Sequence, residues 1–250
     1  MKTETQNKKP IIEIKELRKS YGDNHVLNGF NMVLYEGENL VIMGKSGSGK
    51  SVMIKCLIGL EYPDSGTIEV MGEKIGELNR RTLDELRTEI GFLFQGSALY
   101  DSMTVRENLE FPLRRHTKKF GVLKDTTPLV MEALENVGLA HTIDLMPAEL
   151  SGGMKRRIAL ARTLILQPKI ILYDEPTTGL DPITAKEILL LMKSIQQKYN
   201  TSAIIITHDV DCARVISNRM ILLVDGINYA EGTFEEISTK KDPKIQAFFK

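Results

Sequence analysis

The sequence contains the stretch Gly44-Lys45-Ser46-Gly47-Ser48-Gly49-Lys50-Ser51, which has the spacing G-x-x-x-x-G-K-[ST]. The apolar run 40–43 before it predicts a buried strand, and residues 52–60 after it predict a helix. Glycines at such a junction let backbone N–H groups and the helix dipole point at an oxyanion. The alternative is a flexible Gly/Ser turn, which seldom lies between a strand and a helix by chance. We therefore predict a phosphate-binding loop.

The predicted nucleotide-binding segment runs from Gly44 through Val52. In such loops the lysine, here Lys50, reaches the β- and γ-phosphates of a nucleoside triphosphate. The hydroxyl of the next residue, Ser51, coordinates Mg²⁺. A nucleotide and Mg²⁺ are thus the expected ligands, and Lys50 is a candidate catalytic residue.

Composition limits the class of protein. A chain of 250 residues predicts one large domain, or one domain with an insertion, and 42% hydrophobic with 26% charged residues is ordinary for a globular protein. Its 33 basic and 33 acidic side chains cancel, so no global field attracts nucleic acid or anionic lipid. The cysteines, Cys56 and Cys212, have no disulfide-framework or metal-ligand spacing, and we expect both to be buried thiols in a reducing compartment.

The ends and hydropathy of the chain predict its location. Residues Met1 to Pro10 are polar and lysine-rich, without the apolar core of a signal peptide. No run approaches the roughly 18–20 apolar residues of a membrane span. We expect a cytosolic chain that another subunit holds at the membrane if it acts there.

Strands that alternate with helices predict an α/β core with a mainly parallel sheet. The strands expected at 11–17, 26–34 and 67–71 form a separate β part, and residues 219–224 pair with 227–230 across Asp225-Gly226. The predicted divisions are 1–95 for the β part and phosphate loop, 96–153 for an inserted α-helical subdomain, 154–232 for the rest of the core, and 233–250 for a helical tail. Helix starts are predicted at Asp181-Pro182 and at the capping-box pairs Thr104 with Glu107 and Thr233 with Glu236.

Two adjacent carboxylates follow another buried strand, Ile170 to Tyr173. Ligands of open α/β sheets bind at the carboxyl ends of the strands, where Asp174 would hold Mg²⁺ directly or through water. Glu175 is placed to polarise the attacking water. The alternative is an acidic turn before Pro176.

A second glycine-containing helix start lies at Ser151-Gly152-Gly153. Amides at a helix N-terminus form an anion site, so this segment predicts a second one. Alone it would equally suit a helix capped by Ser151. Together with the phosphate loop and the carboxylate pair, it indicates a composite site.

Three single residues are further candidates. Gln95 ends a strand and would ligate Mg²⁺ or water, His208 follows the strand 203–207 and would contact a γ-phosphate, and Tyr21 lies in a loop where it would stack on a base. Taken singly, each of these residue types is more often structural than functional.

These features occur in the order Tyr21, the loop 44–51, Gln95, Leu150-Ser151-Gly152-Gly153, Asp174-Glu175, Gly179-Leu180-Asp181 and His208. Over nearly its whole length the chain resembles the nucleotide-binding domain of an ABC (ATP-binding cassette) ATPase. The resemblance implies a P-loop NTPase fold and a head-to-tail homodimer around two ATP molecules. Ser151, Gly152 and Gly153 of one copy would then contact the γ-phosphate held by Lys50 of the other, with Asp181 near the seam.

One position departs from the family, because Met154 stands where most members have glutamine. A subgroup is indicated by Gln95-Gly96-Ser97-Ala98-Leu99-Tyr100, Met103-Thr104-Val105-Arg106-Glu107-Asn108-Leu109, Phe111-Pro112-Leu113-Arg114, Gly152-Gly153-Met154 and Asp181-Pro182-Ile183-Thr184. These segments are similar to the ATPase of MCE-type (Mla-like) phospholipid transporters, although ordinary importer ATPases share part of the pattern. The resemblance implies a permease partner on the cytoplasmic face of the inner membrane, with periplasmic lipid-binding proteins and a small regulatory subunit as further partners.

We therefore expect an ATPase that drives a permease, docked near residues 95–114. The apolar positions Leu99, Tyr100, Met103 and Val105 suit such a groove, or else form local core. The alternatives are another importer or exporter ATPase, a soluble ABC ATPase acting on DNA or ribosomes, and a nucleotide-gated adaptor without hydrolysis. The tail 241–250 would brace a dimer, bind a regulatory subunit, or form a plain surface helix.

Overall fold

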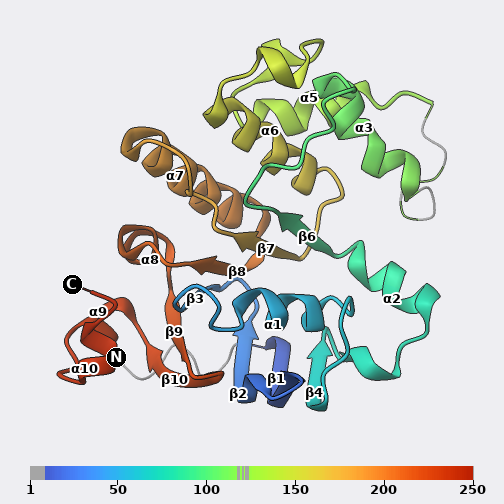
Figure 1. Ribbon diagram of the computed structural model, residues 1–250. Coiled ribbons are helices and arrows are strands. Elements are labelled where there is room, and N and C mark those ends of the chain that lie inside the picture. Colours follow the sequence, from blue (N-terminus) through green and yellow to red (C-terminus); the bar gives the residue numbers. More distant parts are fainter. Residues whose placement is uncertain (1–8, 117–118, 120, 122–123, 250) are drawn as a thin grey trace.

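The computed structural model describes residues 9–116, 119, 121 and 124–249, and Figure 1 shows the arrangement of their elements. The predicted polar start of the chain, up to residue 8, and the last residue of the tail lie outside the described residues. The elements before the helical region are β1 (Pro10–Tyr21), β2 (Asn24–Tyr35), β3 (Asn39–Met43), α1 (Lys50–Leu57), β4 (Ser65–Val70), β5 (Glu73–Lys74), η2 (Ile75–Glu77), α2 (Arg80–Arg87) and β6 (Ile90–Leu93). Those after β6 are α3 (Val105–Arg115), α5 (Thr127–Glu135), η3 (Ala140–Thr142), η4 (Pro147–Glu149), α6 (Gly152–Leu164), β7 (Ile170–Asp174), α7 (Pro182–Tyr199), β8 (Ser202–Thr207), α8 (Val210–Ile216), β9 (Arg219–Val224), β10 (Ile227–Gly232), α9 (Phe234–Ser238) and α10 (Pro243–Gln246).

A six-stranded sheet in the order β10-β9-β3-β8-β7-β6 forms the centre of the molecule. All neighbours in it pair in parallel except β10, which runs antiparallel to β9. Strand β3 is wholly buried, and its side chains alternate between two hydrophobic clusters: Leu40 and Ile42 face one, Val41 and Met43 the other. Burial on both faces explains the continuous apolar sequence of this strand. The predicted α/β core with a mainly parallel sheet is confirmed.

A second sheet, antiparallel and in the order β2-β1-β4-β5, lies across one face of the first. Helix α1 packs between them, with Met53 and Leu57 in the same cluster as Leu17 and Phe30 of the second sheet (Figure 1). Strand β1 extends to Tyr21 rather than ending at Leu17 as predicted. Its register shifts near Glu16, which has a φ of 49°, so a bulge lets the strand continue beyond the polar residues that suggested a break.

The helical region lies beside the β6 edge of the central sheet and has its own hydrophobic cluster, formed by α3, α5 and α6 (Figure 1). Helix α6 belongs to two clusters: Ile158 and Ala161 face this one, whereas Leu160 and Leu164 pack on the central sheet. The helix therefore fixes the helical region to the sheet.

Capping residues begin the helices as predicted. Thr104 and Thr233 form capping boxes, and the Asp181 carboxylate accepts hydrogen bonds from the first turn of α7. The sequence reading missed α8, a helix of seven residues that is capped by Asp209. Cys56 and Cys212 are both buried thiols, as expected.

The tail folds back on its own chain. Ile245 is buried in the cluster beneath the central sheet, and the Tyr229 hydroxyl donates to Asp242 at 2.8 Å. Across the described part of the chain, no helix combines the length and apolar character needed to cross a membrane.

Candidate functional site

The loop between β3 and α1 forms the floor of a cavity of about 620 Å³. The cavity is lined by Val26, Lys45, Ser46, Gly47, Ser48, Gly49, Lys50, Ser51, Val52, Gln95, Asp174, Glu175 and His208. Twelve of these thirteen are residues singled out from the sequence, and they come from four separate segments of the chain. The parallel sheet brings them together, because β3, β8 and β7 are neighbours and end at the same edge.

Two glycines of the loop have no room for a side chain. A Cβ at Gly44 would lie 2.4 Å from Ser48 Oγ and 2.9 Å from the Leu223 carbonyl oxygen. Gly49 has a φ of 102°, and a Cβ there would lie 2.8 Å from the Val26 carbonyl oxygen. The loop is thus wound tightly against neighbouring strands.

The polar groups of the loop fit a phosphate ligand. Lys50 is only 9% exposed, and its Nζ donates to the carbonyl oxygens of Gly44 at 2.6 Å and Lys45 at 3.0 Å. Ser48 Oγ is buried and has no hydrogen-bond partner among the described residues. A buried ammonium held only by carbonyls and an unpaired hydroxyl are both satisfied by an oxyanion.

Glu175 follows β7 with a left-handed backbone, at a φ of 49°. Its Oε1 lies 2.8 Å from His208 Nδ1, while Oε2 accepts hydrogen bonds from the hydroxyls of Thr178 at 3.3 Å and Thr207 at 3.4 Å. These contacts fix the Glu175 carboxylate at the cavity, where one of its oxygens also contacts the exposed His208 ring. The arrangement suits a group that orients a water molecule.

Burial and mutual charge set the electrostatics of the cavity. Burial raises the pKa of the Asp174 carboxyl, Glu175 raises it further, and Lys50 opposes both effects. Burial lowers the pKa of the Lys50 ammonium, whereas Glu175 and Asp174 oppose that shift. Adding a cation and a triphosphate would relieve this imbalance, because each supplies a partner for the opposite charge.

Mg²⁺ fits the oxygen donors of this cavity. Ser51, Gln95 and Asp174 all line it, and within the described ranges no group of three or more His, Cys, Asp and Glu side chains could hold a metal by itself. Mg²⁺ is commonly bound by one or two carboxylates together with substrate phosphates and water. The donor set therefore matches a cation that arrives with its nucleotide.

Tyr21 does not line the cavity. Its hydroxyl donates to Glu61, and this hydrogen bond is the main reason that the pKa of Tyr21 is raised to about 12. The ring is half-exposed at the end of β1, so stacking on a base stays a prediction. Val26 lines the cavity, and the sequence analysis missed it, because nothing in an apolar strand residue signals contact with a ligand.

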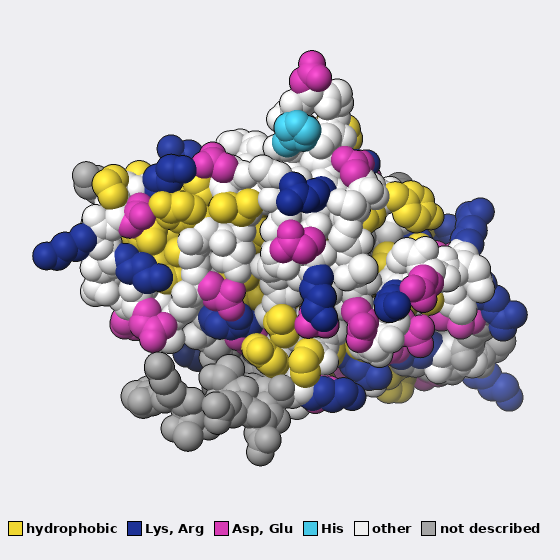
Figure 2. All heavy atoms as spheres, turned by 90° about the horizontal axis from the view of Figure 1, so that it is seen from below, with side chains coloured by type: hydrophobic (Ala, Val, Ile, Leu, Met, Phe, Trp, Pro, Cys, Tyr) yellow, Lys and Arg dark blue, Asp and Glu magenta, His cyan; other side chains and the backbone are white. Residues whose placement is uncertain are grey.

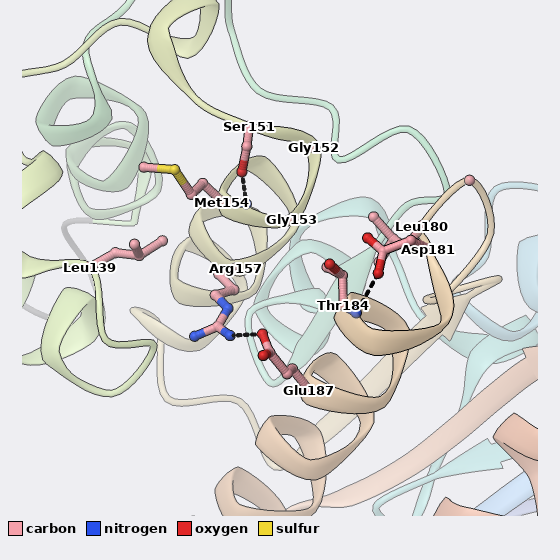
Figure 3. Close-up of a pocket in the computed structure, with 11 residues that line it drawn as sticks. Leu139, Ser151, Gly152, Gly153, Met154, Arg157, Leu180, Asp181, Thr184 and Glu187 are labelled. Carbon is pink, nitrogen blue, oxygen red and sulfur yellow. Dashed lines mark hydrogen bonds and ion pairs between the residues drawn. The ribbon is translucent and has the colours of Figure 1, made fainter.

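A second cavity, of about 440 Å³, lies between the starts of α6 and α7 (Figure 3). Its lining includes the other predicted binding residues, Ser151, Gly152, Gly153 and Asp181. Ser151 caps α6 by accepting a hydrogen bond from the Met154 amide at 3.2 Å, so the capped-helix alternative describes it correctly. The first amides of a helix lack intrahelical acceptors, and those of Gly152 and Gly153 therefore remain suited to an anion.

Helices α6 and α7 are held together at this cavity (Figure 3). Arg157 of α6 pairs with Glu187 of α7 at 2.7 Å, and Asp181 accepts from the amides of Ile183 and Thr184. Hydrogen bonds from Thr184, followed by that from Ile183, lower the pKa of the Asp181 carboxyl. Met154, the departure from the family pattern, also lines the cavity. The predicted second anion site thus lies at a junction of two helix starts that contact each other.

The linings of the two cavities have no residue in common. One chain supplies a phosphate loop with carboxylates in one place and the Ser151 helix start in another. Within one chain, the two sets of residues therefore line separate cavities.

Comparison with known proteins agrees with this geometry. The family described as ABC transporter matches residues 27–178. The "Probable ribonucleotide transport ATP-binding protein mkl" of Mycobacterium leprae is 40% identical over 95% of this chain and 68% of its own length. The "Methionine import ATP-binding protein MetN" of Brucella abortus is 40% identical over 89% of this chain. The chain spans only 60% of the length of that second relative.

Solved structures with the same architecture include the ATP-binding cassette MJ0796, a dimer in a post-hydrolysis state bound to ADP and Pi. It is 33% identical, with a TM-score of 0.79 over 89% of this chain and 98% of that one. The structure of cbiO1 from Clostridium perfringens, part of the ABC transporter complex cbiONQ, is 30% identical. Its TM-score is 0.84 over 93% of this chain and 92% of that one.

Proposed function

Since this chain belongs to the ABC transporter family and is an ATPase subunit that hydrolyses ATP, we propose that hydrolysis here drives a membrane permease. The permease would hold the chain at the cytoplasmic face of the membrane. One observation carries the proposal: an open groove adjoins the loop that bears Gln95.

The groove has a volume of about 1500 Å³ and lies between α2 and α3. Its lining combines apolar and charged side chains, and consists of Arg80, Arg81, Asp84, Glu85, Arg87, Thr88, Glu89, Phe94, Ala98, Tyr100, Phe111, Pro112, Arg115, His116, Lys119 and Arg162. Phe94 is 50% and Tyr100 44% exposed, and Tyr100 packs on Phe111 with ring centroids 4.9 Å apart. Aromatic side chains exposed in a groove suit the side chains of a short partner helix.

The four apolar positions expected in this groove have different environments. Tyr100 lines it, whereas Val105 is fully buried in the helical cluster, so the local-core alternative is correct for Val105 and the groove alternative is not. Leu99 is partly buried against two clusters, and Met103 is also partly buried. A capping box places Val105 at the first position of α3, which turns it inward.

We assign the residues of the first cavity as follows. Lys50 and the amides of the loop hold the β- and γ-phosphates, and Ser51, Asp174 and Gln95 hold Mg²⁺, which supplies charge neutralisation when bound. Glu175 orients water for attack, and His208 contacts the γ-phosphate. In a head-to-tail homodimer, Ser151, Gly152 and Gly153 of the second copy would complete the site, with Asp181 at the seam.

The dimeric state of the MJ0796 cassette supports this pairing. ATP would close two copies because its phosphates bind groups of both, and release of phosphate would reopen them. Phe94 lines the groove and Gln95 the cavity, so a permease helix in the groove would sense the state of the nucleotide site.

Purification of the full chain from a detergent extract tests the permease proposal. We expect a transmembrane protein to copurify, and Phe111→Arg to abolish its recovery because a cation would replace the ring that packs on Tyr100 in the groove. Leu190→Arg, at an exposed position of α7 outside the groove, is the control and should leave recovery unchanged. Recovery of ribosomes or DNA in place of a membrane protein would support the soluble alternative.

On the face seen in Figure 2, basic and acidic side chains are interspersed without a broad basic area, so this face carries no electrostatic footprint for nucleic acid. The cargo is a separate question. The names of the curated relatives, methionine import and ribonucleotide transport, favour the broader proposal of an importer or exporter ATPase over a phospholipid transporter. The phospholipid proposal rests on the sequence segments around Gln95 and Met154. Mass spectrometry of lipids bound to the copurified permease and its periplasmic partners would decide it.

A further inference from the structure

Arg156, on α6, contacts two loops of the candidate catalytic site at once. Only 4% of its surface is exposed. Its Nη1 donates to the carbonyl oxygen of Phe94 at 2.7 Å, and Nη2 donates to that of Thr178 at 3.3 Å. A single planar guanidinium therefore joins two segments that are more than 80 residues apart in the sequence.

Both contacts lie next to residues assigned to the reaction. Phe94 immediately precedes Gln95, so Arg156 fixes the backbone from which the Gln95 side chain projects. Thr178 donates through its hydroxyl to Glu175 Oε2 at 3.3 Å, so the same arginine steadies the loop that holds this carboxylate.

Burying the charged guanidinium of Arg156 costs free energy that a side chain used only for packing would not cost. In the described ranges no carboxylate forms an ion pair with it, and its Nε has no hydrogen-bond partner. Burial lowers the pKa of its guanidinium, which reflects the cost of keeping the cation there. An apolar side chain of similar length would fill the space without that cost. A buried cation that is held only by two carbonyls suggests a role beyond packing.

A second arginine of α6 supports the same interpretation. Arg162 donates to the carbonyl oxygens of Ser97 at 3.2 Å and Ala98 at 2.8 Å. The loop that carries Gln95 is thus tied to α6 on both sides. Of these two arginines, only Arg156 also donates a hydrogen bond to the loop that holds Glu175.

We propose that Arg156 is a positioning residue for ATP hydrolysis, which fixes the loops of Gln95 and Glu175 to the helix that begins at Ser151. The proposal rests on the roles assigned to Gln95 and Glu175 above. When a second copy engages Ser151, movement of α6 reaches both loops together through this one side chain.

The test is Arg156→Met in the full chain, measured with a fluorescent ATP analogue and by phosphate release. ATP should bind with unchanged stoichiometry and a KM within about twofold, because the phosphate loop is untouched. The kcat should fall about 10–100-fold, the usual effect of a misplaced catalytic group. The Mg²⁺ concentration at half-maximal rate should rise, since Gln95 is less well placed.

Two variants separate positioning from stability. Arg156→Lys keeps the charge and one contact, and should recover part of the kcat and of the Mg²⁺ dependence. Arg219→Met removes another largely buried arginine, which pairs with Glu38 and Glu231 away from the cavity. It should lower the midpoint of thermal unfolding but leave kcat per bound nucleotide and the Mg²⁺ dependence unchanged.

The outcomes are distinct. Arg156→Met with wild-type kcat and Mg²⁺ dependence would overturn the proposal, and so would a loss of activity that matches a loss of nucleotide-binding stoichiometry. Gln95→Ala and Glu175→Gln are measured alongside. If Gln95→Ala and Glu175→Gln retain full hydrolysis, the roles assigned to Gln95 and Glu175 are wrong. If those two variants lose hydrolysis but Arg156→Met retains it, only the positioning role of Arg156 is wrong.

Discussion

Glu175 and Asp174 are adjacent in sequence, yet their surroundings give them different properties. The left-handed backbone at Glu175 directs its carboxylate to His208, Thr178 and Thr207. Asp174 is partly buried, and no side chain within the described ranges donates a hydrogen bond to it. Backbone strain of this kind recurs at functional sites. Hydrogen bonds thus hold the Glu175 carboxylate in place, whereas the Asp174 carboxylate is suited to bind a cation.

Glu175→Gln should reduce ATP hydrolysis at least about 100-fold, because the amide cannot accept a proton from the attacking water. ATP binding should persist, and the nucleotide-bound dimer should accumulate on size-exclusion chromatography. Asp225→Asn, at an exposed carboxylate paired only with Lys244, is the matched control and should hydrolyse normally. Turnover close to wild type in Glu175→Gln would exclude Glu175 as the group that activates water.

Asp174→Asn should stabilise the nucleotide-free chain at neutral pH. The pKa of Asp174 is raised in the folded state, so its ionisation costs free energy above that pKa, and the cost disappears as the pH falls through it. The group is half-exposed and its charge is partly screened, so the unfolding midpoint should rise by at most about 2–4 °C. Calorimetry across the pH range checks the sign: the gain should shrink toward acid pH. A lower midpoint at neutral pH would contradict the prediction.

At the scale of elements, α6 determines how the two cavities relate. Its first turn forms the second cavity, its middle carries Arg156 and Arg157, and its two faces join the helical cluster to the sheet. Helices shared by two hydrophobic clusters move as rigid bodies, because neither side can give way separately.

Gly153→Ala and Gly152→Ala form a matched pair that tests this junction. A Cβ at Gly153 would lie 2.7 Å from Thr184 Cγ2, so either the Thr184 side chain must rotate or α6 and α7 must move apart, whereas a Cβ at Gly152 meets nothing within 4 Å. Gly153→Ala should keep ATP binding by the phosphate loop but reduce ATP-driven dimerisation about tenfold or more. Light scattering with the Glu175→Gln background measures it.

The result for Gly152→Ala shows why dimerisation is reduced in Gly153→Ala. Loss of dimerisation in Gly152→Ala as well would mean that a second copy approaches this surface closely. Normal dimerisation in both variants would contradict a role for the α6 start.

Most of the fold could be predicted from local patterns. The phosphate loop between β3 and α1, the capping boxes and the buried parallel strands each depend on neighbouring residues, and the structure contains them. The helix α8 was missed because seven residues show no clear periodicity, and the bulge at Glu16 hid the continuation of β1. Val26 and Arg156 could not be found, because their surroundings are made by residues distant in the sequence.

For the whole molecule, the separation of the cavities predicts complementation between variants. Lys50→Ala disables the first cavity and Gly153→Ala the second, so each homodimer should be inactive. A mixed dimer retains one intact composite site, and an equimolar mixture should recover about a quarter of wild-type hydrolysis by random pairing.

A mixture of wild type with Lys50→Ala provides the control, since it shows whether dimers with one intact site turn over. If those dimers are active while the mixture of the two variants is not, the head-to-tail arrangement is excluded. Phosphate release after mixing at several ratios measures both cases.

The lack of a shared residue between the two cavities also has a genetic consequence. A damaged copy made alongside a normal one would enter most assemblies, leaving about a quarter of them with both members sound. Because each mixed dimer still keeps one complete site, a lesion at either surface should leave about half of the wild-type hydrolysis in a cell that also carries the intact allele.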